Sequence, residues 1–354
     1  VLVLGTGATA GWHAAAVRRW LPEARLVIAG RDVGAAAALA SRCAAEACSL
    51  DAALATPARG NSLAIVTLPP VPRRPWVEAA LRSGRHVLSE KPLAATLPEA
   101  RALLQLAEQQ GVVLASCGSR FLEHPATRAV TELLRVGHLG RVLGMHLLQR
   151  RVRARPGIEY QPGSSWFLDP QIAGGGVLLD WGPYDLALID ETLCPQTVRV
   201  VHANLARPLT EIDPAGLAPG IEQQLHATLL CQGPFGEIPV YWERTACSHL
   251  PEQELTALEG ESSAVSWQWK DWEPGNYSLM GDREGQWVVR SATLGRDGGI
   301  PLHDRPLVGL LRAMAGDPAG ALLGSRLRFL VELLFAVQAT AMDGTPRTIE
   351  RPAG

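Results

Sequence analysis

The sequence predicts a two-domain α/β protein, with a doubly wound parallel sheet in the first domain and an α+β fold in the second. Its 354 residues are roughly twice the ~150 residues of a typical domain. Up to residue 120, short buried strands alternate with helical stretches, which indicates a parallel sheet covered by helices. From residue 121 onward, long segments alternate polar and apolar residues, which indicates an antiparallel or mixed sheet.

The expected strands of the first domain, residues 1–120, are short, rich in β-branched residues and bounded by glycine or proline. They are Val1–Leu4, Leu26–Ala29, Leu63–Thr67, His86–Ser89 and Val112–Ser116. Helical composition lies between them, at Ala14–Trp20, Val33–Glu46, Pro75–Ser83 and Leu97–Gln110. Thr96 precedes Glu99 by three residues, which is the capping-box spacing and marks the start of the last of these helices.

The second domain, residues 121–354, is expected to combine a few helices with a run of strands. The helices are predicted at Ala126–Val136, Gly175–Leu193, Leu307–Met314 and Arg326–Met342. The strands are predicted at Arg141–Arg153, Thr197–Ala206, Gln223–Cys231, Gly236–Thr245, Ala264–Trp272 and Trp287–Ala292, and loops at Asp213–Gly220 and Pro274–Gly285. Pro183 lies inside the second helix, which is therefore expected to kink or to begin anew there.

Charge and hydropathy exclude two classes of partner. The chain has 33 basic and 35 acidic residues and a net charge of −2, so no basic surface for nucleic acid is expected. No apolar run approaches the ~20 residues of a membrane span, because charged residues interrupt Leu327–Met342. We expect neither a nucleic-acid nor a membrane partner.

The six cysteines include no CxxC pair and no cysteine–histidine spacing of a zinc site. We therefore expect buried free thiols in a reducing, cytoplasmic compartment, and no metal site. The chain begins with Val1 and enters a predicted strand at once, so we expect that further residues precede it in the natural protein.

A glycine-rich turn follows the first predicted strand and opens a helix. Its residues are Gly5-Thr6-Gly7-Ala8-Thr9-Ala10, which match the G-x-G-x-x-A fingerprint of dinucleotide-binding Rossmann domains. Gly5 permits the tight turn, and Gly7 lets the backbone approach a pyrophosphate. The helix N-terminus supplies free N–H groups and a positive dipole end for that anion. We predict that all six residues bind the cofactor.

The end of the second strand predicts which nicotinamide cofactor binds. An NAD site usually has an acidic residue there, which accepts a hydrogen bond from the ribose 2′-hydroxyl. Here Gly30 occupies that position, and Arg31 follows with a guanidinium suited to a 2′-phosphate. The alternative is that Arg31 is merely solvated and that Asp32 contacts the ribose. We favour NADP(H) over NAD(H).

Lysine is very rare in this chain. Only Lys91 and Lys270 occur among the 33 basic residues. A buried lysine can give up its proton whereas arginine cannot, so a lysine kept in an arginine-rich chain indicates a chemical role. Lys91 stands in Glu90-Lys91-Pro92, directly after a predicted strand and hence at the carboxyl edge of the sheet, where ligands bind.

With the fingerprint, this motif makes the sequence resemble the glucose–fructose oxidoreductase / inositol dehydrogenase (Gfo/Idh/MocA) family. The matching segments extend along the chain and are His13, Thr67–Pro70, Ser83–Val87, Arg120-Phe121, His124-Pro125, Trp166, Gly174–Tyr184 and Ala341–Pro346. The resemblance implies a C-terminal domain with a large, mostly antiparallel open sheet, and a homodimer or homotetramer formed through it. It adds Thr67, Leu68, Pro69, Glu90, Lys91 and Trp166 to the expected cofactor-binding residues.

The resemblance also implies an active centre made of Lys91, Asp180 and Tyr184. The family more commonly has histidine at the last position, and tyrosine resembles the glucose–fructose oxidoreductase and dihydrodiol dehydrogenase branch. Asp180 and Tyr184 are four residues apart and share one helix face. The hypothesis is that Tyr184 exchanges a proton with the substrate oxygen, while Lys91 stabilises the phenolate and the developing alkoxide. The alternative is that Tyr184 is a core or interface aromatic residue.

We therefore expect hydride transfer between a nicotinamide and a hydroxyl or carbonyl group of a small molecule: a sugar, sugar derivative or cyclic diol. Arg120, Arg153 and Arg155 are candidates for binding an anionic substrate, although a solvated sheet end would also account for the last two. The alternative functions are a non-catalytic NAD(P)-binding sensor of the same fold and a bilin reductase. The Lys91, Asp180 and Tyr184 set argues against both.

Overall fold

The computed structural model describes residues 1–354 except 56, 59, 153–161, 210–220, 271–274, 296–299 and 354. The chain divides into two compact units. The first unit comprises residues 1–120 and 300–328, and the second comprises residues 121–299 and 329–353. The segment 300–328, predicted as part of the second domain, packs with the first unit.

The first unit contains a six-stranded, fully parallel sheet in the order β3-β2-β1-β4-β5-β6. The strands are β1 (Leu2–Leu4), β2 (Val27–Gly30), β3 (Glu46–Ser49), β4 (Leu63–Val66), β5 (His86–Ser89) and β6 (Leu114–Ser116). The order reverses between β1 and β4, and this switch point is where open α/β sheets bind ligands at their carboxyl edge. The predicted doubly wound sheet is confirmed.

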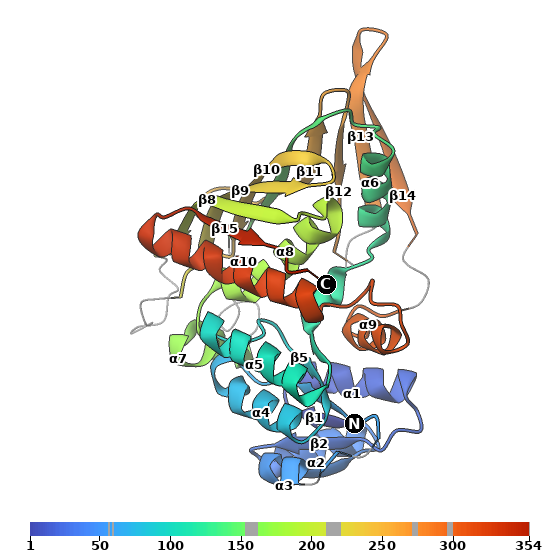
Figure 1. Cartoon of the computed structure of the whole chain (residues 1–354), viewed down its shortest axis with the longest axis vertical. Helices are drawn as coiled ribbons and strands as arrows, with labels where there is room; N and C mark the ends of the chain where they lie inside the picture. Colours follow the sequence, from blue (N-terminus) through green and yellow to red (C-terminus); the bar gives the residue numbers. More distant parts are fainter. Residues whose placement is uncertain are drawn as a thin grey trace. The chain divides into compact units, whose positions relative to one another are not determined.

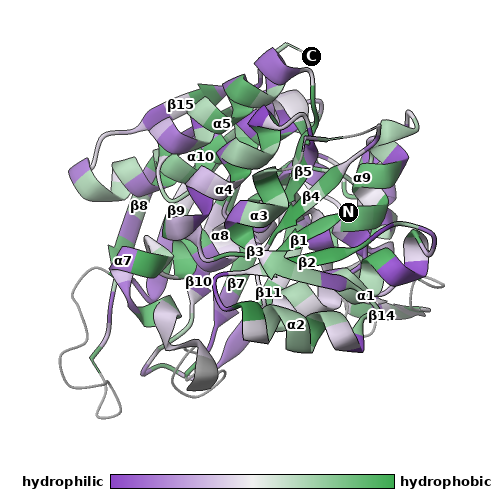
Figure 2. Ribbon diagram, turned by 90° about the horizontal axis from the view of Figure 1, so that it is seen from below, coloured by the Kyte–Doolittle hydropathy of each residue, from purple (hydrophilic) through white to green (hydrophobic). Residues whose placement is uncertain are grey.

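Helices cover both faces of this sheet. They are α1 (Ala8–Trp20), α2 (Val33–Arg42), α3 (Leu50–Ala55), α4 (Pro70–Arg82), α5 (Leu97–Gln110), η1 (Cys117–Phe121) and α9 (Arg305–Met314). One hydrophobic core lies between the strands and α1, α2 and α9, where Ile28 and Ile65 meet Val17, Leu39 and Leu307. The strands β1, β2, β4 and β5 are correspondingly hydrophobic in Figure 2. Helices α4 and α5 pack on each other, with α4 against β4 and β5 (Figure 1).

One helix of the first unit is shorter than predicted. The expected helix Val33–Glu46 ends at Arg42, and Glu46–Ser49 forms the edge strand β3. Ala44 has a φ of 49°, a left-handed conformation that no helix continues through. An edge strand pairs on one side only and is partly exposed, so β3 lacks the apolar run by which a buried strand is recognised.

The second unit contains a nine-stranded sheet in the order β14-β13-β12-β11-β7-β10-β9-β8-β15. Its strands are β7 (Val142–Arg150), β8 (Thr197–Ala206), β9 (Gln224–Gly233), β10 (Gly236–Thr245), β11 (Gln253–Gly260), β12 (Ala264–Trp267), β13 (Gly275–Arg283), β14 (Gln286–Leu294) and β15 (Arg347–Glu350). Among the strands that the structure describes in this sheet, β10 and β7 pair in parallel and the other neighbouring pairs are antiparallel. The mostly antiparallel sheet expected from the resemblance is confirmed.

Two helices pack on each other and against this sheet. Helix α6 (Pro125–Arg135) contacts β12 and β13, and α8 (Val177–Leu193) contacts β9 and β10. The remaining elements are η2 (Pro162–Leu168), α7 (Pro170–Ala173) and α10 (Gly324–Asp343). Helix α8 runs through Pro183 as one element, so it does not begin anew there as one expectation held.

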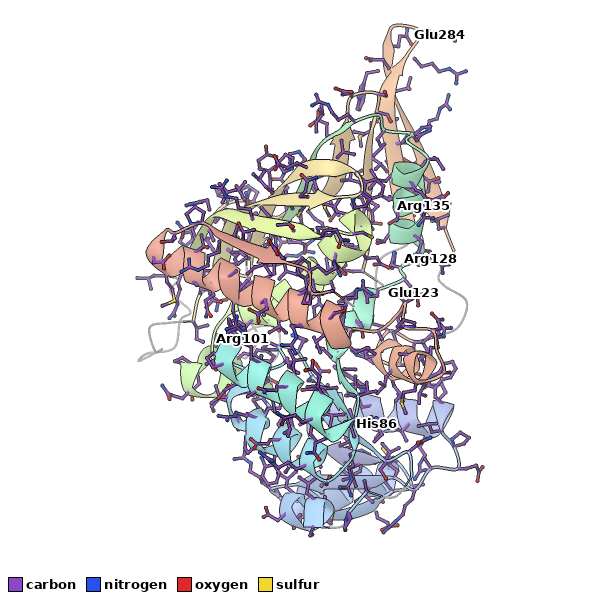
Figure 3. The ribbon with its side chains drawn as sticks, viewed as in Figure 1. His86, Arg101, Glu123, Arg128, Arg135 and Glu284 are labelled. Carbon is purple, nitrogen blue, oxygen red and sulfur yellow. The ribbon has the colours of Figure 1, made fainter. Side chains whose placement is uncertain are left out.

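A segment predicted as a loop is a strand. Pro274–Gly285 was expected to be a loop, but β13 (Gly275–Arg283) forms there, and only Glu284 and Gly285 make the turn. Figure 3 shows Glu284 at the far end of the hairpin of β13 and β14. Because β13 lies between β12 and β14, hydrogen bonds on both sides outweigh its poor strand composition. The strands β11 and β15 were not predicted, and the expected loop Asp213–Gly220 lies outside the described residues.

Among the described residues, no helix is long and apolar enough to cross a membrane. All six cysteines are free thiols. Cys117, Cys231 and Cys247 are buried as predicted, whereas Cys43 and Cys48 are half-buried and Cys194 is exposed.

Candidate cofactor and catalytic site

The predicted fingerprint turn joins β1 to α1 at the carboxyl edge of the first sheet. Gly5 has a φ of +132°, which only glycine adopts readily, and a Cβ there would lie 2.2 Å from Thr67 Oγ1. The Thr67 hydroxyl donates to the Leu4 carbonyl at 3.0 Å, so the ends of β1 and β4 are joined at this point. A Cβ on Gly7, the residue before α1, would meet nothing within 4 Å. The turn thus leaves room in front of the α1 N-terminus, as a bound pyrophosphate requires.

The end of β2 bears on cofactor choice. A Cβ on Gly30 would lie 2.5 Å from Thr6 Cγ2, so an acidic side chain has no space at this position. Asp32 is the N-cap of α2, and its Oδ1 accepts from the Ala35 N–H at 3.0 Å. Arg31 is exposed between them. The structure therefore gives Asp32 a helix-capping role and leaves Arg31 facing solvent.

Glu90 is a buried anion held by three donors. Its Oε1 accepts from Arg120 Nη2 at 2.7 Å and from His13 Nε2 at 3.2 Å, and its Oε2 accepts from the Lys91 backbone N–H at 3.2 Å. Burial alone would raise the pKa of Glu90, but Arg120, His13 and Lys91 outweigh it and hold the pKa well below its ordinary value. Arg120, predicted to bind substrate, is thus engaged in an ion pair with Glu90.

His13, Glu90 and Cys117 offer three donor atoms within 4.8 Å of one another, a spacing that would suit a metal ion. Two features favour a hydrogen-bonded cluster instead. Burial raises the pKa of the Cys117 thiol well above its ordinary value, which keeps the proton on sulfur. Arg120 already neutralises the Glu90 carboxylate and would repel a cation. The absence of a metal site therefore stays a prediction.

Lys91 is half-buried and lies directly after β5, at the carboxyl edge of the sheet. The Lys91–Pro92 peptide bond is cis. The backbone of Glu90, Lys91 and Pro92 is contacted by Arg73 of α4, which is only 2% exposed. Arg73 donates to the carbonyls of Leu68 at 2.7 Å and of Lys91 at 3.4 Å, and also to those of Glu90 and Pro92.

Arg73 was not predicted as a site residue, although its position in an apolar helix face could have identified it. It lies on the buried face of α4 with Val77, Ala80 and Leu81, at helical spacing. An arginine in such an apolar row is unusual, since arginines are rarely buried unless their donors are satisfied. With 31 arginines in the chain, this position did not stand out.

His303 was also missed, because it precedes α9 far along the chain. Its ring stacks on Trp12 of α1, with centroids 3.9 Å apart and planes 16° from parallel. Burial, helped by the positive charges of Arg120 and His13, lowers the pKa of His303 to about 4. His303 is thus neutral at physiological pH and extends the Glu90 cluster to the α9 segment.

In the second unit, the three glycines before α8 have different surroundings. Gly174 has a φ of +78° and ends α7. A Cβ on Gly175 would lie 2.9 Å from the flexible end of Leu179, whereas a Cβ on Gly176 would lie 1.8 Å from the Glu222 backbone oxygen. The motif thus allows Glu222 to approach the start of α8.

Glu222 caps α8 and thereby sets where the helix begins. Its carboxylate accepts from the N–H groups of Gly176 at 2.8 Å and Leu178 at 3.1 Å. Its backbone oxygen accepts from the Val177 N–H at 3.0 Å. Three N–H groups that a helix start leaves unpaired are satisfied by one residue, and the carboxylate also complements the helix dipole. The start of α8 fixes in turn the directions of Asp180 and Tyr184.

Asp180 and Tyr184 lie on α8 and, four residues apart, share one face of it. Asp180 is half-buried in the first turn, while Tyr184 is only 3% exposed. The Tyr184 ring meets Phe121 edge-on, with centroids 4.9 Å apart, and Trp181 with centroids 5.6 Å apart. Both residues belong to the second unit and Lys91 belongs to the first, so the meeting of the three stays a prediction.

A buried ionic network supports this helix. Asp185 accepts from Arg244 Nε at 2.8 Å and from Trp242 Nε1 at 3.0 Å, and the Arg244 guanidinium lies 4.7 Å from the centre of the Trp181 ring. The second lysine follows β12 outside the sheet: Lys270 is 1% exposed, and its Nζ lies 2.6 Å from Glu254 of β11. Lys270 is thus paired with a carboxylate within the second unit.

Trp166, predicted to contact the cofactor, lies in the second unit. Trp166 is half-buried, stacks on Phe167 with centroids 3.8 Å apart, and packs against the cluster of Leu168, Ala173 and Ile221. Its contact with a cofactor stays a prediction. Arg153 and Arg155 lie outside the described residues.

Two family models match the chain. One, described as an oxidoreductase family with an NAD-binding Rossmann fold, matches residues 1–117. The other, a GFO/IDH/MocA C-terminal domain, matches residues 127–249. The dTDP-3,4-didehydro-2,6-dideoxy-alpha-D-glucose 3-reductase of Streptomyces antibioticus is 42% identical over 121 residues, which are 34% of this chain and 34% of that protein.

A second curated relative is the D-xylose 1-dehydrogenase [NADP(+)] of Haloarcula marismortui, 29% identical over 113 residues, which are 32% of this chain and 30% of that protein. The matched segments thus span about a third of the length of these relatives. Levoglucosan dehydrogenase, in complex with NADH and levoglucosan, has a similar structure with a TM-score of 0.75 and 17% identity. The likeness covers 99% of both chains and shows a shared fold.

The packing at Gly176 leads to a stability prediction. The G176A substitution should lower the free energy of unfolding by about 3 kcal/mol or more, because the methyl group displaces Glu222 from three N–H groups. The matched variant G175A should cost about 1 kcal/mol or less, because its methyl group meets only the movable end of Leu179. Denaturant-induced unfolding followed by tryptophan fluorescence measures both. Equal losses would contradict the capping role of Glu222.

The low pKa of His303 leads to a pH prediction. Its pKa falls from 6.5 to about 4 on folding, so between these values the unfolded chain binds a proton that the folded chain does not. Folding stability should therefore decrease as the pH falls through this window. Because His303 is partly exposed, we expect a loss of about 1–2 kcal/mol after solvent screening. The H303Q variant should lack this component, whereas H138Q, which removes an exposed histidine, should keep it. Identical pH profiles for wild type and H303Q would contradict the prediction.

Proposed function

The chain belongs to the Gfo/Idh/MocA oxidoreductase family, and from this premise we propose that it is an NAD(P)-dependent oxidoreductase acting on CH–OH groups of sugars or sugar derivatives. The observation that carries the proposal is the position of Lys91. It follows β5 at the carboxyl edge of the same sheet whose first turn carries the dinucleotide fingerprint. A lysine at that edge lies where a parallel sheet binds its ligands.

The residues at this edge fit a dinucleotide. Gly5 and Gly7 keep the turn free of side chains, and the N–H groups at the start of α1 would hold the pyrophosphate. Thr67, Leu68 and Pro69 follow the neighbouring strand β4. When bound, the nicotinamide supplies or accepts the hydride.

In the proposed mechanism, the protein's own residues move the proton. Tyr184 exchanges it with the substrate oxygen, and its ring is held by edge contacts with Phe121 and Trp181. Lys91 stabilises negative charge on the phenol and on the substrate oxygen, and Asp180 orients the ammonium group. The proposal requires these three residues to meet at the substrate.

We favour NADP(H) over NAD(H) because of Gly30, Arg31 and Asp32. Gly30 has no space for the acidic side chain of an NAD site, and Asp32 is engaged in capping α2. The exposed Arg31 guanidinium is left to pair with a 2′-phosphate. The relatives include both a dehydrogenase named for NADP(+) and one bound to NADH, so the choice rests on these three residues.

The substrate class and the assembly are also part of the proposal. The relatives named above act on a dTDP-linked deoxysugar and on xylose, which favours a sugar or sugar derivative here. A homodimer or homotetramer through the large sheet is supported by Tyr241 and Leu255, which are 48% and 37% exposed. They pair with His146 and Leu148, two residues apart on β7, and so share one sheet face.

Turnover with a panel of sugars tests the activity. The purified chain should oxidise NADPH, followed by the nicotinamide absorbance, with at least one keto-sugar or nucleotide-linked keto-sugar. K91M and Y184F should each lower kcat by about 100-fold or more, because each removes a group that stabilises or transfers the proton. The control Y241F removes only an exposed hydroxyl, keeps the ring at the proposed sheet interface, and should keep full activity. Cofactor binding without turnover across the panel would favour the non-catalytic sensor instead.

Arg31 tests the cofactor preference. R31A should raise the KM for NADPH by roughly 10- to 100-fold, because a charge-assisted pair with the 2′-phosphate is lost, and should leave the KM for NADH unchanged. R42A, which removes an exposed arginine at the other end of α2, is the matched control. Equal effects of R31A on both cofactors would contradict a role in 2′-phosphate binding.

A further inference from the structure

We propose that Arg73 is a positioning residue that fixes the direction of the Lys91 side chain by holding the backbone on both sides of it. The inference rests on the proposed function in one respect, the assignment of Lys91 to catalysis. Its physical content, that a buried guanidinium orients this lysine, stands on contacts within the first unit alone.

Arg73 joins two loops at the carboxyl edge of the sheet. Its Nε donates to the Leu68 carbonyl at 2.7 Å, in the segment that follows β4. Its two terminal nitrogens donate to the carbonyls of Glu90, Lys91 and Pro92, in the segment that follows β5. Since β4 and β5 are paired neighbours, one side chain holds the ends of two adjacent parallel strands together.

These contacts determine where Lys91 points. The Glu90 carbonyl and the Lys91 N–H belong to one planar peptide group, and the Lys91 carbonyl belongs to the next. The two planes meet at the Lys91 Cα. Holding both carbonyls therefore fixes φ and ψ of Lys91 and, with them, the direction of its Cα–Cβ bond.

The Glu90 carboxylate holds the first of these planes from its N–H end. Its Oε2 accepts from the Lys91 N–H at 3.2 Å, while Arg73 donates to the carbonyl oxygen of the same peptide group. The carboxylate is itself fixed by Arg120 and His13. The peptide group before Lys91 thus has a buried partner at both of its polar ends.

The guanidinium stays charged in this position. Burial lowers the pKa of Arg73 to about 10, and the nearby negative charge of Glu90 opposes this effect. A cation next to the Glu90 cluster therefore adds to the charge balance as well as supplying donors. Arg74, the next residue along α4, is by contrast exposed and lies 3.8 Å from Glu99 on the surface.

Lysine is not equivalent to arginine here. A guanidinium presents five N–H donors in one rigid plane, which can serve four carbonyls at once, whereas an ammonium is a point charge with three donors on a flexible stem. R73K should therefore preserve the charge but lose the fixed geometry. It separates an electrostatic role of Arg73 from a positioning role.

The scarcity of lysine allows a direct measurement. Growth on isotope-labelled lysine gives a spectrum with two backbone amide signals, from Lys91 and Lys270, and K91R assigns them. R73Q should shift the Lys91 signal and leave the Lys270 signal in place, because Lys270 lies in the second unit. The matched control R74Q should move neither. If R73Q does not fold, R73K replaces it, and its extra signal is recognised by its absence from the wild type.

Kinetics on the same variants supply the second readout. R73K and R73Q should lower kcat by about 10- to 100-fold, the cost of a misplaced catalytic group, with a smaller change in the KM for the sugar. R74Q should behave as wild type. A purely structural role would lower the amount of folded protein without moving the Lys91 signal in the folded fraction.

Two results separate the two proposals. If the Lys91 signal and kcat are unchanged in folded R73K and R73Q, the positioning role is wrong. If the wild type shows no turnover with any sugar but the Lys91 signal moves in R73Q, Arg73 does orient Lys91, and it is the proposed oxidoreductase function that fails.

Discussion

The first unit depends on one buried carboxylate. Glu90 lies at the end of a central strand, away from water, and is tolerable there only because Arg120, His13 and the Lys91 N–H satisfy it. These donors come from η1, from α1 and from the chain directly after β5. The charge of one side chain thus joins elements far apart in the sequence, and removing any one donor leaves a buried anion incompletely paired.

In the second unit, too, a glutamate accepts hydrogen bonds from backbone N–H groups. The first N–H groups of α8 have no partners within the helix, and Glu222 supplies them with three acceptor contacts. Such a close approach is possible only because Gly176 has no side chain. In both units, therefore, a glutamate fixes the backbone near a residue proposed for catalysis: the buried Glu90 does so for Lys91 and the half-buried Glu222 for Asp180.

The sequence alone predicted the elements whose structure is determined by residues close to them in the chain. The buried parallel strands, the fingerprint turn and the start of α5 at Thr96 were recognised because each depends on neighbours within a few residues. The sequence did not predict the elements and contacts that depend on residues far away in the chain. β13 forms in a segment of poor strand composition because β12 and β14 flank it, and the partners of Glu90 stand up to 77 residues away.

The Glu-Lys-Pro motif shows why the site residues were only partly predictable. Its lysine was singled out by chemistry, because lysine can exchange a proton whereas arginine, the other cationic residue of this chain, cannot. Its glutamate was predicted only as a cofactor-binding residue, and Arg73 was not predicted at all. A reactive group can be recognised by its type, but the groups that orient it are recognised only by their contacts. Arg73 donates to backbone carbonyls, which every residue possesses, so no sequence pattern distinguishes its acceptors.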